Sequence, residues 1–331
     1  MHVRLNKEGL LFISLFVIIF SLAIFNAKIY SAFLAEVLYP TQIYVSPVRI
    51  TANVISAGLN EENLKLAFVG DIMLDRAVEG KILKKGDGDF RFPFLNIADE
   101  LRAYDFLFGN LEGPLSADEG INSGSAISFR IDPRALEGLE FAGFDALSVA
   151  NNHSGDRGGK VFRDTLSNLN GAGIMAIGTS TEPAILNIGS LRVALVGFAD
   201  FPGPGVRATV PNIVEALGKA RVNADIVIAS FHFGEEYHPE PSGRQRELAH
   251  LAVDSGADLV IGHHPHVSQP VESYKDSYIA YSLGNFIFDQ NFSEETMKSI
   301  LLEIEVRGKK ISGAITREII LNQDYQPSFV D

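Results

Sequence analysis

From Leu64 onward the sequence alternates short apolar runs with stretches of helical periodicity, and this alternation limits the possible folds more than any other feature. Apolar side chains recur at helical spacing in Val161–Leu169 and in Leu248–Ala252. Gly171 and Gly256 follow these stretches, and we expect each glycine to end a helix. Strands that alternate with helices indicate a layered α/β fold with a mostly parallel sheet.

The last strands of the pattern are not separated by helices. Before them, an aspartate–proline pair, Asp132 and Pro133, predicts one more helix, with Asp132 as its N-cap, that runs toward Gly143. Beyond that helix, three late apolar stretches have no helical pattern between them, so we expect either a second, mixed or antiparallel sheet or an antiparallel edge packed on the first sheet. These stretches cover residues 277–288, 299–306 and 311–321.

Five of the apolar runs end in residues that can bind a metal or a phosphate. If these runs are strands of one parallel sheet, all five polar clusters leave it at the same edge, where open α/β sheets bind their ligands. In chain order the clusters are Asp71; Asn110 and Glu112; Asn151, Asn152 and His153; His232; and His263, His264 and His266.

His264 and His266 are separated only by Pro265. In an extended segment their side chains point the same way, which favours binding to one ion or to neighbouring ions, and the proline would stiffen the turn between them. A single histidine after a strand is more often a hydrogen-bonding loop residue, and Asp71 could simply cap the following helix. The joint placement of four histidines at strand ends favours a metal site.

Composition limits the partners. The chain has 331 residues and a formal net charge of -13, which argues against nucleic-acid binding because such proteins need a basic face. The chain has no cysteine, so any metal must be held by His, Asp, Glu or Asn. Imidazoles and carboxylates together suit Mn, Zn or Fe.

The N-terminus contains an uncharged run, Leu10–Phe25, preceded by Arg4 and Lys7. We expect a cytoplasmic tip at residues 1–9, a single transmembrane anchor at 10–27, a stalk at 28–63 and one extracytoplasmic domain at 64–331. A cleaved signal peptide and a buried core helix are the alternatives.

Six motifs together resemble a known family. They are VGDIML (69–74), GNLEGPLS (109–116), VANNHSGDRG (149–158), FHFGEEY (231–237), GADLVIGHHPHVSQPVE (256–272) and YSLGNFIFDQ (281–290). The chain resembles the bacterial capsule-synthesis family named for the poly-γ-glutamate biosynthesis protein CapA, which is similar to the calcineurin-like metallophosphoesterases. The resemblance covers about residues 64–292 and implies a metallophosphoesterase-like sandwich that holds one or two divalent metal ions.

Carried over by motif, the resemblance implies roles for individual residues. His153 would contact the scissile group and donate a proton to the leaving oxygen, and Asn110 and Asp156 would accompany it in catalysis. The chain departs from the pattern at Met73, which stands where an Asp-x-His pair has its histidine, and at the GNLE motif, which replaces a bridging aspartate. One ion, or two with Glu112 as the bridge, are both open. The implied metal ligands are Asp71, Glu112, Asn152, His232, His264 and His266.

The expected function follows from this resemblance. It implies a membrane-anchored, metal-dependent hydrolase-like protein that helps to make or export poly-γ-glutamate or a similar capsule polymer. Its substrate would be a phosphoester or an anionic polymer, and capsule synthetase subunits would be possible partners. A non-catalytic scaffold for such a synthetase is the alternative. An anionic polymer would need the metal or local cations to bind, and candidate cations are Arg157, Arg163, Arg244 and Arg246.

Overall fold

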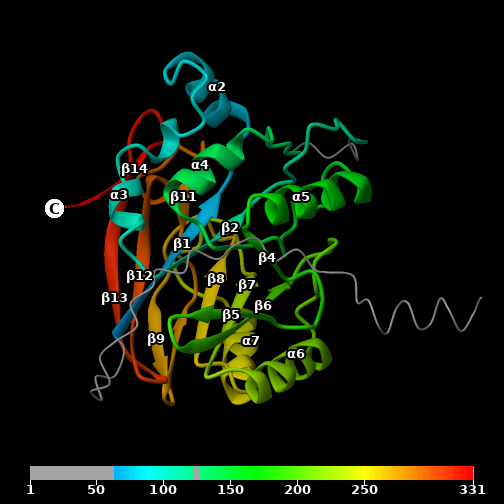
Figure 1. The fold of residues 1–331 in the computed structure, drawn as a ribbon, viewed down its shortest axis with the longest axis vertical. Helices are drawn as coiled ribbons and strands as arrows, with labels where there is room; N and C mark the ends of the chain where they lie inside the picture. Colours follow the sequence, from blue (N-terminus) through cyan, green and yellow to red (C-terminus); the bar gives the residue numbers. More distant parts are fainter. Residues whose placement is uncertain (1–62, 122–126, 331) are drawn as a thin grey trace, which may run out of the picture. The chain divides into compact units, whose positions relative to one another are not determined.

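The computed structural model describes residues 63–121 and 127–330, which form two β-sheets packed face to face with helices on their outer faces (Figure 1). The expected tip and anchor, and the stalk up to residue 62, lie outside the described residues and stay predictions. Within these two described ranges, no helix is both long and apolar enough to cross a bilayer.

The first sheet has eight strands. Its core is parallel, because β1 to β4 run in the same direction, and β11 lies parallel to β1. Its other side, β12 to β14, is antiparallel. In spatial order the strands are β14 (Pro327–Phe329), β13 (Lys310–Leu321), β12 (Lys298–Arg307), β1 (Asn63–Ile72), β2 (Phe106–Leu111), β3 (Ala146–Ser148) and β4 (Met175–Ile177), with β11 (Asn285–Ile287) off this path.

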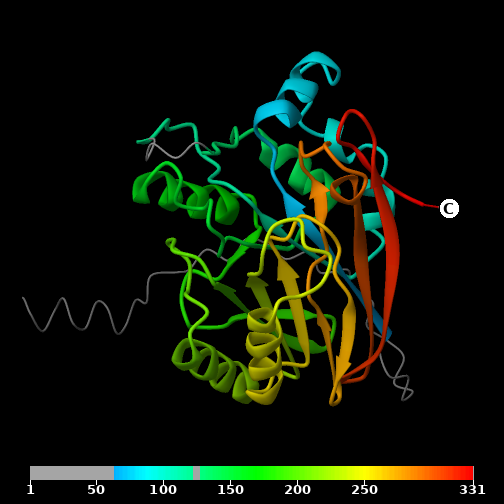
Figure 2. The ribbon, with the colours of Figure 1, turned by 180° about the vertical axis from the view of Figure 1, so that it is seen from behind.

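The second sheet has six strands. Its four inner strands are parallel and its two edge strands are antiparallel to their neighbours. Figure 2 shows its later strands from behind. In spatial order the strands are β5 (Ala184–Ile188), β6 (Leu191–Ala199), β7 (Ile226–His232), β8 (Leu259–His263), β10 (Ser277–Ala280) and β9 (Val271–Tyr274).

One expectation about the sheets was wrong, and one alternative that the sequence left open is decided by the structure. The five polar-ended runs are not in one sheet, since β1, β2 and β3 belong to the first and β7 and β8 to the second. Of the two arrangements expected for the C-terminal strands, the antiparallel edge is confirmed for β12 to β14, because β12 pairs with β1 and extends the first sheet, whereas β10 joins the second sheet. The reason is that β12 is apolar on both faces: Leu301 packs under the helices and Leu302 packs between the sheets.

The helices match the sequence pattern with shifted boundaries. The helix expected from Asp132 begins later, because Asp132 accepts a hydrogen bond from the backbone of Arg134 in a turn before the first helical residue. It ends as predicted at Gly143, whose φ is 88°. The helices are α2 (Arg76–Lys84), α3 (Ala98–Leu101), α4 (Ala135–Ala142), α5 (Gly159–Gly171), α6 (Val210–Asn223) and α7 (Gly243–Asp254), with 3₁₀ turns η1 (Phe92–Phe94) and η2 (Glu295–Met297).

The glycines that follow α5 and α7 behave differently. Gly256, with φ 112°, follows the last turn of α7 as predicted. The helix α5 ends at Gly171 as predicted, but this glycine is itself helical, and the left-handed residue after the helix is Gly173, with φ 75°. A capping box between Ser242 and Gln245 fixes the start of α7.

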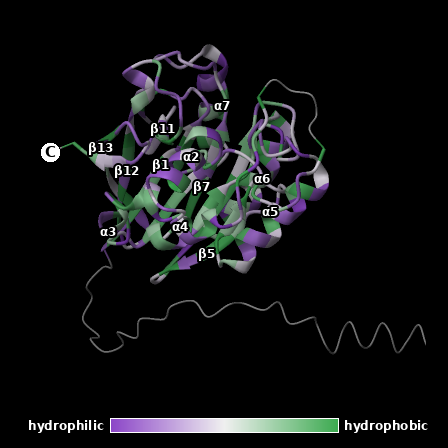
Figure 3. Ribbon diagram, turned by 90° about the horizontal axis from the view of Figure 1, so that it is seen from above, coloured by the Kyte–Doolittle hydropathy of each residue, from purple (hydrophilic) through white to green (hydrophobic). Residues whose placement is uncertain are grey.

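The core consists of three layers of apolar side chains, because alternate residues of each strand face opposite sides. In β1, Leu66 and Phe68 pack between the sheets, whereas Ala67 and Val69 face the helices of the first sheet. In the same way, Val227 of β7 packs under α6 and α7. Figure 3 shows the strands as the hydrophobic interior of the ribbon. This packing holds the strand ends in fixed positions.

Candidate metal centre

The polar clusters meet at one edge of the sandwich, although they come from both sheets. Asp71 ends β1, Asn110 lies near the end of β2, and His232 and His263 end β7 and β8. All four are buried. Parallel strands that point the same way in both sheets bring their carboxyl ends together, so the expected meeting of these groups is confirmed despite the wrong sheet assignment.

Asp71 lies at the centre of the cluster. Its Oδ1 accepts a hydrogen bond from Nδ2 of Asn110 at 2.9 Å, and its Oδ2 accepts one from the backbone N–H of His264 at 3.2 Å. Nδ1 of His263 lies 3.4 Å from Oδ1, and Nδ1 of His266 lies 3.4 Å from Oδ2. Asp71 therefore joins the two sheets. Burial alone would raise the pKa of this carboxyl, but the neighbouring imidazoles of His263 and His266 hold it well below its usual range.

Glycines allow the chain to close around Asp71. The backbone of Asp71 donates to the carbonyl oxygen of Gly284 at 2.9 Å, so this segment passes directly over β1. A Cβ at Gly70 would lie 1.8 Å from that same oxygen, and a Cβ at Gly262 would lie 2.0 Å from the oxygen of Tyr281. The glycines of the Gly-Asp and Gly-His steps are therefore required by the close approach of residues 281–284.

Glu112 and His266 form the second part of the centre. Glu112 is fully buried, and its Oε1 has no hydrogen-bond partner although it lies 3.6 Å from Nε2 of His266. Burial raises the pKa of Glu112 well above its usual range. Burial would lower the pKa of His266, but the carboxylates of Glu112 and Asp71 raise it to about 9. Without a cation this pair therefore holds a proton that a bound ion would displace.

His232 and His264 lie beside this pair, with ring centroids 4.9 Å apart. Nε2 of His232 is 2.8 Å from Oδ1 of Asn152, so two expected ligands are in direct contact. Burial lowers the pKa of His232 well below its usual range and that of His264 to about 3. Both imidazoles are therefore neutral at pH 7, the form that binds metals.

His153 lies at the edge of the cluster and is oriented by two contacts. Its Nδ1 lies 2.9 Å from Oδ2 of Asp156, and its ring lies 4.3 Å from that of Phe129. Asp156 also accepts from the backbone of Phe129. A carboxylate that holds Nδ1 leaves Nε2 as the nitrogen that can face a substrate. Asn110 is linked to the segment that carries His153 by Asn151, because Nδ2 of Asn151 donates a hydrogen bond to Oδ1 of Asn110 at 3.1 Å.

Three further residues of the centre were not among the implied ligands or catalytic residues, although the sequence pattern had placed His263 in the polar cluster after its strand. His263 is buried and contacts Asp71, and neither of its ring nitrogens has a hydrogen-bond partner. Asn285 lies opposite Asp71 in β11 and contacts His266 at 2.9 Å. Glu236 lies within reach of His264 and His266. The sequence signal for Asn285 and Glu236 was their place inside the quoted motifs, but no spacing rule distinguished them.

The donor set fits a divalent cation. Donor atoms of Asp71, Glu112 and His266 all lie within 4.8 Å of one another. A buried carboxylate oxygen without a partner is costly unless a proton or a cation satisfies it. Carboxylates and imidazoles together suit Mn, Zn or Fe. Glu112, Asp71 and His266 would hold such an ion, with His264, His232 and Asn152 beside it.

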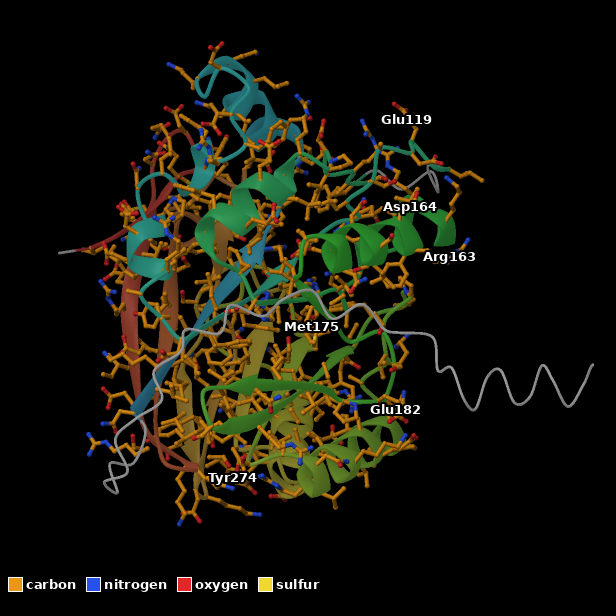
Figure 4. All side chains as sticks on the ribbon, viewed as in Figure 1. Glu119, Arg163, Asp164, Met175, Glu182 and Tyr274 are labelled. Atoms are coloured by element: carbon orange, nitrogen blue, oxygen red, sulfur yellow. The ribbon has the colours of Figure 1, made fainter. Side chains whose placement is uncertain are left out.

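The candidate arginines do not line this centre. Arg163 is exposed on α5 (Figure 4), and Arg244 is paired with Asp200. Arg157 donates to the backbone oxygen of Phe129 at 3.3 Å. Arg76 reaches the edge of the centre: its guanidinium carbon lies 4.9 Å from the centroid of the Phe129 ring, which also packs on His153.

Comparison with solved structures supports the fold. A phosphatase from Mycoplasma pneumoniae superposes with a TM-score of 0.51 at 13% sequence identity, covering 78% of this chain and 94% of that protein. At this identity the likeness concerns the fold alone. The two-sheet α/β sandwich of this chain is therefore similar in fold to that phosphatase.

Sequence comparison gives the family. The profile of the family described as bacterial capsule synthesis protein PGA_cap matches residues 65–290. The PGA biosynthesis protein CapA of Bacillus subtilis is 34% identical over 266 residues, 75% of this chain and 69% of that protein. The capsule biosynthesis protein CapA of Bacillus anthracis is 34% identical over 74% of this chain and 64% of its own length. This chain belongs to the PGA_cap family, and it spans about two thirds of the length of these relatives.

Proposed function

We propose that this chain is a membrane-anchored, extracytoplasmic protein of capsule polymer biosynthesis whose metal centre hydrolyses a phosphoester or an anionic polymer. The observation that carries the hydrolase proposal is that donor atoms of Asp71, Glu112 and His266 lie close together and that the buried Oε1 of Glu112 has no hydrogen-bond partner. The names of the two Bacillus relatives support poly-γ-glutamate or a similar capsule polymer as the biological context. The uncharged run at residues 10–25 supports the anchor.

The metal ion and residues of this chain would have separate roles in the reaction. When bound, a divalent cation supplies a Lewis acid that stabilises negative charge developing on oxygen. His153 would protonate the leaving oxygen, and Asp156 would hold its ring in the required orientation. Capsule synthetase subunits are the partners that we propose for the domain.

Arg76 is suited to hold the anionic group of the substrate. Its Nε and Nη2 face the carboxylate of Asp289, which fixes the plane of the guanidinium. The guanidinium also lies over Phe129 and Phe288, whose rings pack against His153 and His266 respectively. Its side chain is 38% exposed, so the remaining nitrogen, Nη1, can reach a ligand. A guanidinium held in a fixed plane favours the binding of carboxylate and phosphate groups.

A direct test is hydrolysis of p-nitrophenyl phosphate by the purified full-length chain with Mn²⁺. We expect His153→Asn to lower kcat by about 10² to 10⁴-fold without changing metal affinity. His250→Asn is the matched control, because His250 stacks on Tyr274 outside the centre. Wild-type turnover in His153→Asn would sink the hydrolase proposal.

The second candidate function is a non-catalytic scaffold for a capsule synthetase. The observation in its favour is Met73, which leaves the Asp-x-His pattern incomplete. Deletion of the chain should then remove surface polymer, and a His264→Ala variant should restore it. Failure of His264→Ala to restore the polymer, together with restoration by the wild type, would favour catalysis.

A further inference from the structure

A segment outside the strand ends reaches into the metal centre. After β7 the chain passes through Glu236 to Tyr237, whose backbone N–H donates to the carbonyl oxygen of Pro265 at 2.8 Å. Pro265 lies between His264 and His266, so this hydrogen bond ties the segment directly to the two imidazoles. The carboxylate of Glu236 is thereby placed beside the His264–His266 pair although no strand delivers it.

The backbone at this junction is strained on both sides of the hydrogen bond. Tyr237 has φ 63°, His264 has φ 99° and His266 has φ 59°. Residues with a Cβ rarely adopt this left-handed region, and such conformations persist where the surrounding structure enforces them, often at ligand sites. Three of them in two hydrogen-bonded segments indicate that the position of Glu236 relative to the imidazoles is specified by the fold.

The side chains present a complete donor group. One oxygen of Glu236 and one ring nitrogen each of His264 and His266 lie within 4.8 Å of one another. An exposed glutamate alone would mean little. However, His264 is only 5% exposed, and its buried Nδ1 has no hydrogen-bond partner. An unpartnered, buried imidazole nitrogen points independently to a ligand at this place.

This donor group and the buried group of Asp71 and Glu112 have His266 in common. Nδ1 of His266 is 2.9 Å from Oδ1 of Asn285, which leaves Nε2 for an ion. One nitrogen coordinates one ion, so the two groups describe a single shared centre.

Met73 explains why such a ligand is needed. Its side chain is fully buried in the core, and its sulfur accepts a hydrogen bond from the backbone N–H of Asp75 at 3.2 Å. It therefore supplies no donor to the centre, and a thioether would be a poor ligand for Mn or Zn in any case. The position where the family pattern has an imidazole is thus filled by core packing.

We propose that Glu236 is a metal ligand of this centre and supplies, together with His264 and His266, the coordination that Met73 cannot. The inference rests on the proposed metal centre and adds a ligand that comes from the loop after β7. It predicts that the centre is bound by carboxylates from both sheets, Asp71 and Glu112 from the first and Glu236 from the second.

The test is Mn²⁺ binding to the purified full-length chain, measured by the free-ion EPR signal, with Glu236→Gln compared with Glu235→Gln. Glu235 is the neighbouring exposed glutamate, and its carboxylate lies 3.5 Å from His238 instead. We expect Glu236→Gln to weaken Mn²⁺ binding by about tenfold or more and Glu235→Gln to stay within about twofold of the wild type. Absorption of bound Co²⁺ should also change in Glu236→Gln only.

The outcomes separate this inference from the proposed function. Equal Mn²⁺ affinity and equal Co²⁺ spectra in the two variants, with tight binding by the wild type, would overturn the role of Glu236 and leave the metal centre intact. Absence of Mn²⁺ and Co²⁺ binding by the wild type would overturn both. Both substitutions are on the surface, so thermal unfolding should be unchanged and any loss of binding is attributable to the carboxylate.

Discussion

At the scale of single residues, the identity of a side chain matters less than the direction in which the backbone places it. Met73 follows Asp71 by two residues in an extended segment, yet it packs in the core beside Ile72 and Leu74 rather than in the centre. The parallel pairing of β1 with β11 shifts register between Asp71 and Ile72, which turns the following residues away. In this chain the residue that departs from the family pattern, Met73, therefore serves core packing and not metal binding.

Substitution of Met73 tests this interpretation. Met73→Ala removes a fully buried side chain, so we expect the free energy of unfolding to fall by about 2 to 5 kcal/mol. Met175→Ala in β4 (Figure 4), where the side chain is only partly buried, should cost less. Urea denaturation of the two full-length variants measures this. An unchanged stability of Met73→Ala combined with weaker Mn²⁺ binding would show instead that Met73 is a ligand.

Arg76 gives a prediction about substrate affinity. If its guanidinium holds the anionic group, Arg76→Gln should raise KM for a phosphoester by about tenfold, the loss of one charge-assisted contact of about 1.4 kcal/mol. Arg134→Gln is a closely matched control, because Arg134 pairs with Asp132 and lies 4.6 Å from the Phe90 ring but does not contact the centre. Equal KM values in the two variants would contradict the role of Arg76.

At the scale of elements, one aspartate before each of four parallel strands fixes the register of the sheets. Each accepts a hydrogen bond from a backbone N–H of the neighbouring strand and donates its own N–H to that strand, which satisfies groups that the strand end would leave unpaired. These aspartates and their strands are Asp105 (β2), Asp145 (β3), Asp225 (β7) and Asp258 (β8).

Asp145 should make stability depend on pH. Burial raises the pKa of Asp145 to about 6 from a usual 3.8, and the bond from Leu107 offsets only part of this. Between these values the folded state keeps a proton that the unfolded state loses, so the contribution of Asp145 to stability is most favourable below about pH 4 and becomes less favourable by about 2 to 3 kcal/mol as the pH rises through 6. Asp145→Asn should remove this fall.

Urea denaturation at pH 4 and pH 7.5 measures the difference. We expect Asp145→Asn to gain stability relative to the wild type by about 2 to 3 kcal/mol more at pH 7.5 than at pH 4. Asp105→Asn, at the equivalent but exposed position before β2, is the control. An Asp145→Asn effect that is the same at both pH values would contradict the assignment.

Gly70 tests the close approach that shapes the centre. A Cβ there would lie 1.8 Å from the backbone oxygen of Gly284, so Gly70→Ala must displace the segment that precedes β11. We expect a loss of several kcal/mol in the free energy of unfolding, together with loss of Mn²⁺ binding. Gly218→Ala in α6, where a Cβ would meet nothing within 4 Å, should instead stabilise the chain by about 0.5 to 1 kcal/mol. Similar effects of the two substitutions on stability would contradict the crowding at Gly70.

At the scale of the whole molecule, the sequence predicted correctly that the polar groups lie close together, but it did not predict correctly which sheet contains each strand. Apolar runs that end in Asp71, His232 or His264 mark strand ends, and parallel strands bring their ends together in either sheet. The assignment of each strand to one of the two sheets was not predictable, because strands buried on both faces have the same apolar pattern in either sheet. The pairing of β12 with β1 likewise depends on contacts between residues far apart in the sequence.

The residues missed at the site have the same cause. Asn285 and Glu236 reach the centre through non-local contacts, a parallel pairing with Asp71 and a hydrogen bond to Pro265. No local spacing reveals such contacts. His263 was visible at a strand end, but only the structure shows that its ring contacts Asp71. The strand ends therefore gave the chemical class of the site, and tertiary contacts completed its ligand set.

The central claim is that carboxylate and imidazole groups from both sheets converge on a divalent cation. The most direct measurement is the metal content and Mn²⁺ affinity of the purified full-length chain and of its His266→Ala variant, with His238→Ala as an exposed control. The account predicts at least one tightly bound ion per chain in the wild type and the control, and a loss of affinity of about 100-fold or more in His266→Ala. Equal Mn²⁺ binding by wild type and His266→Ala, or no binding by either, would contradict it.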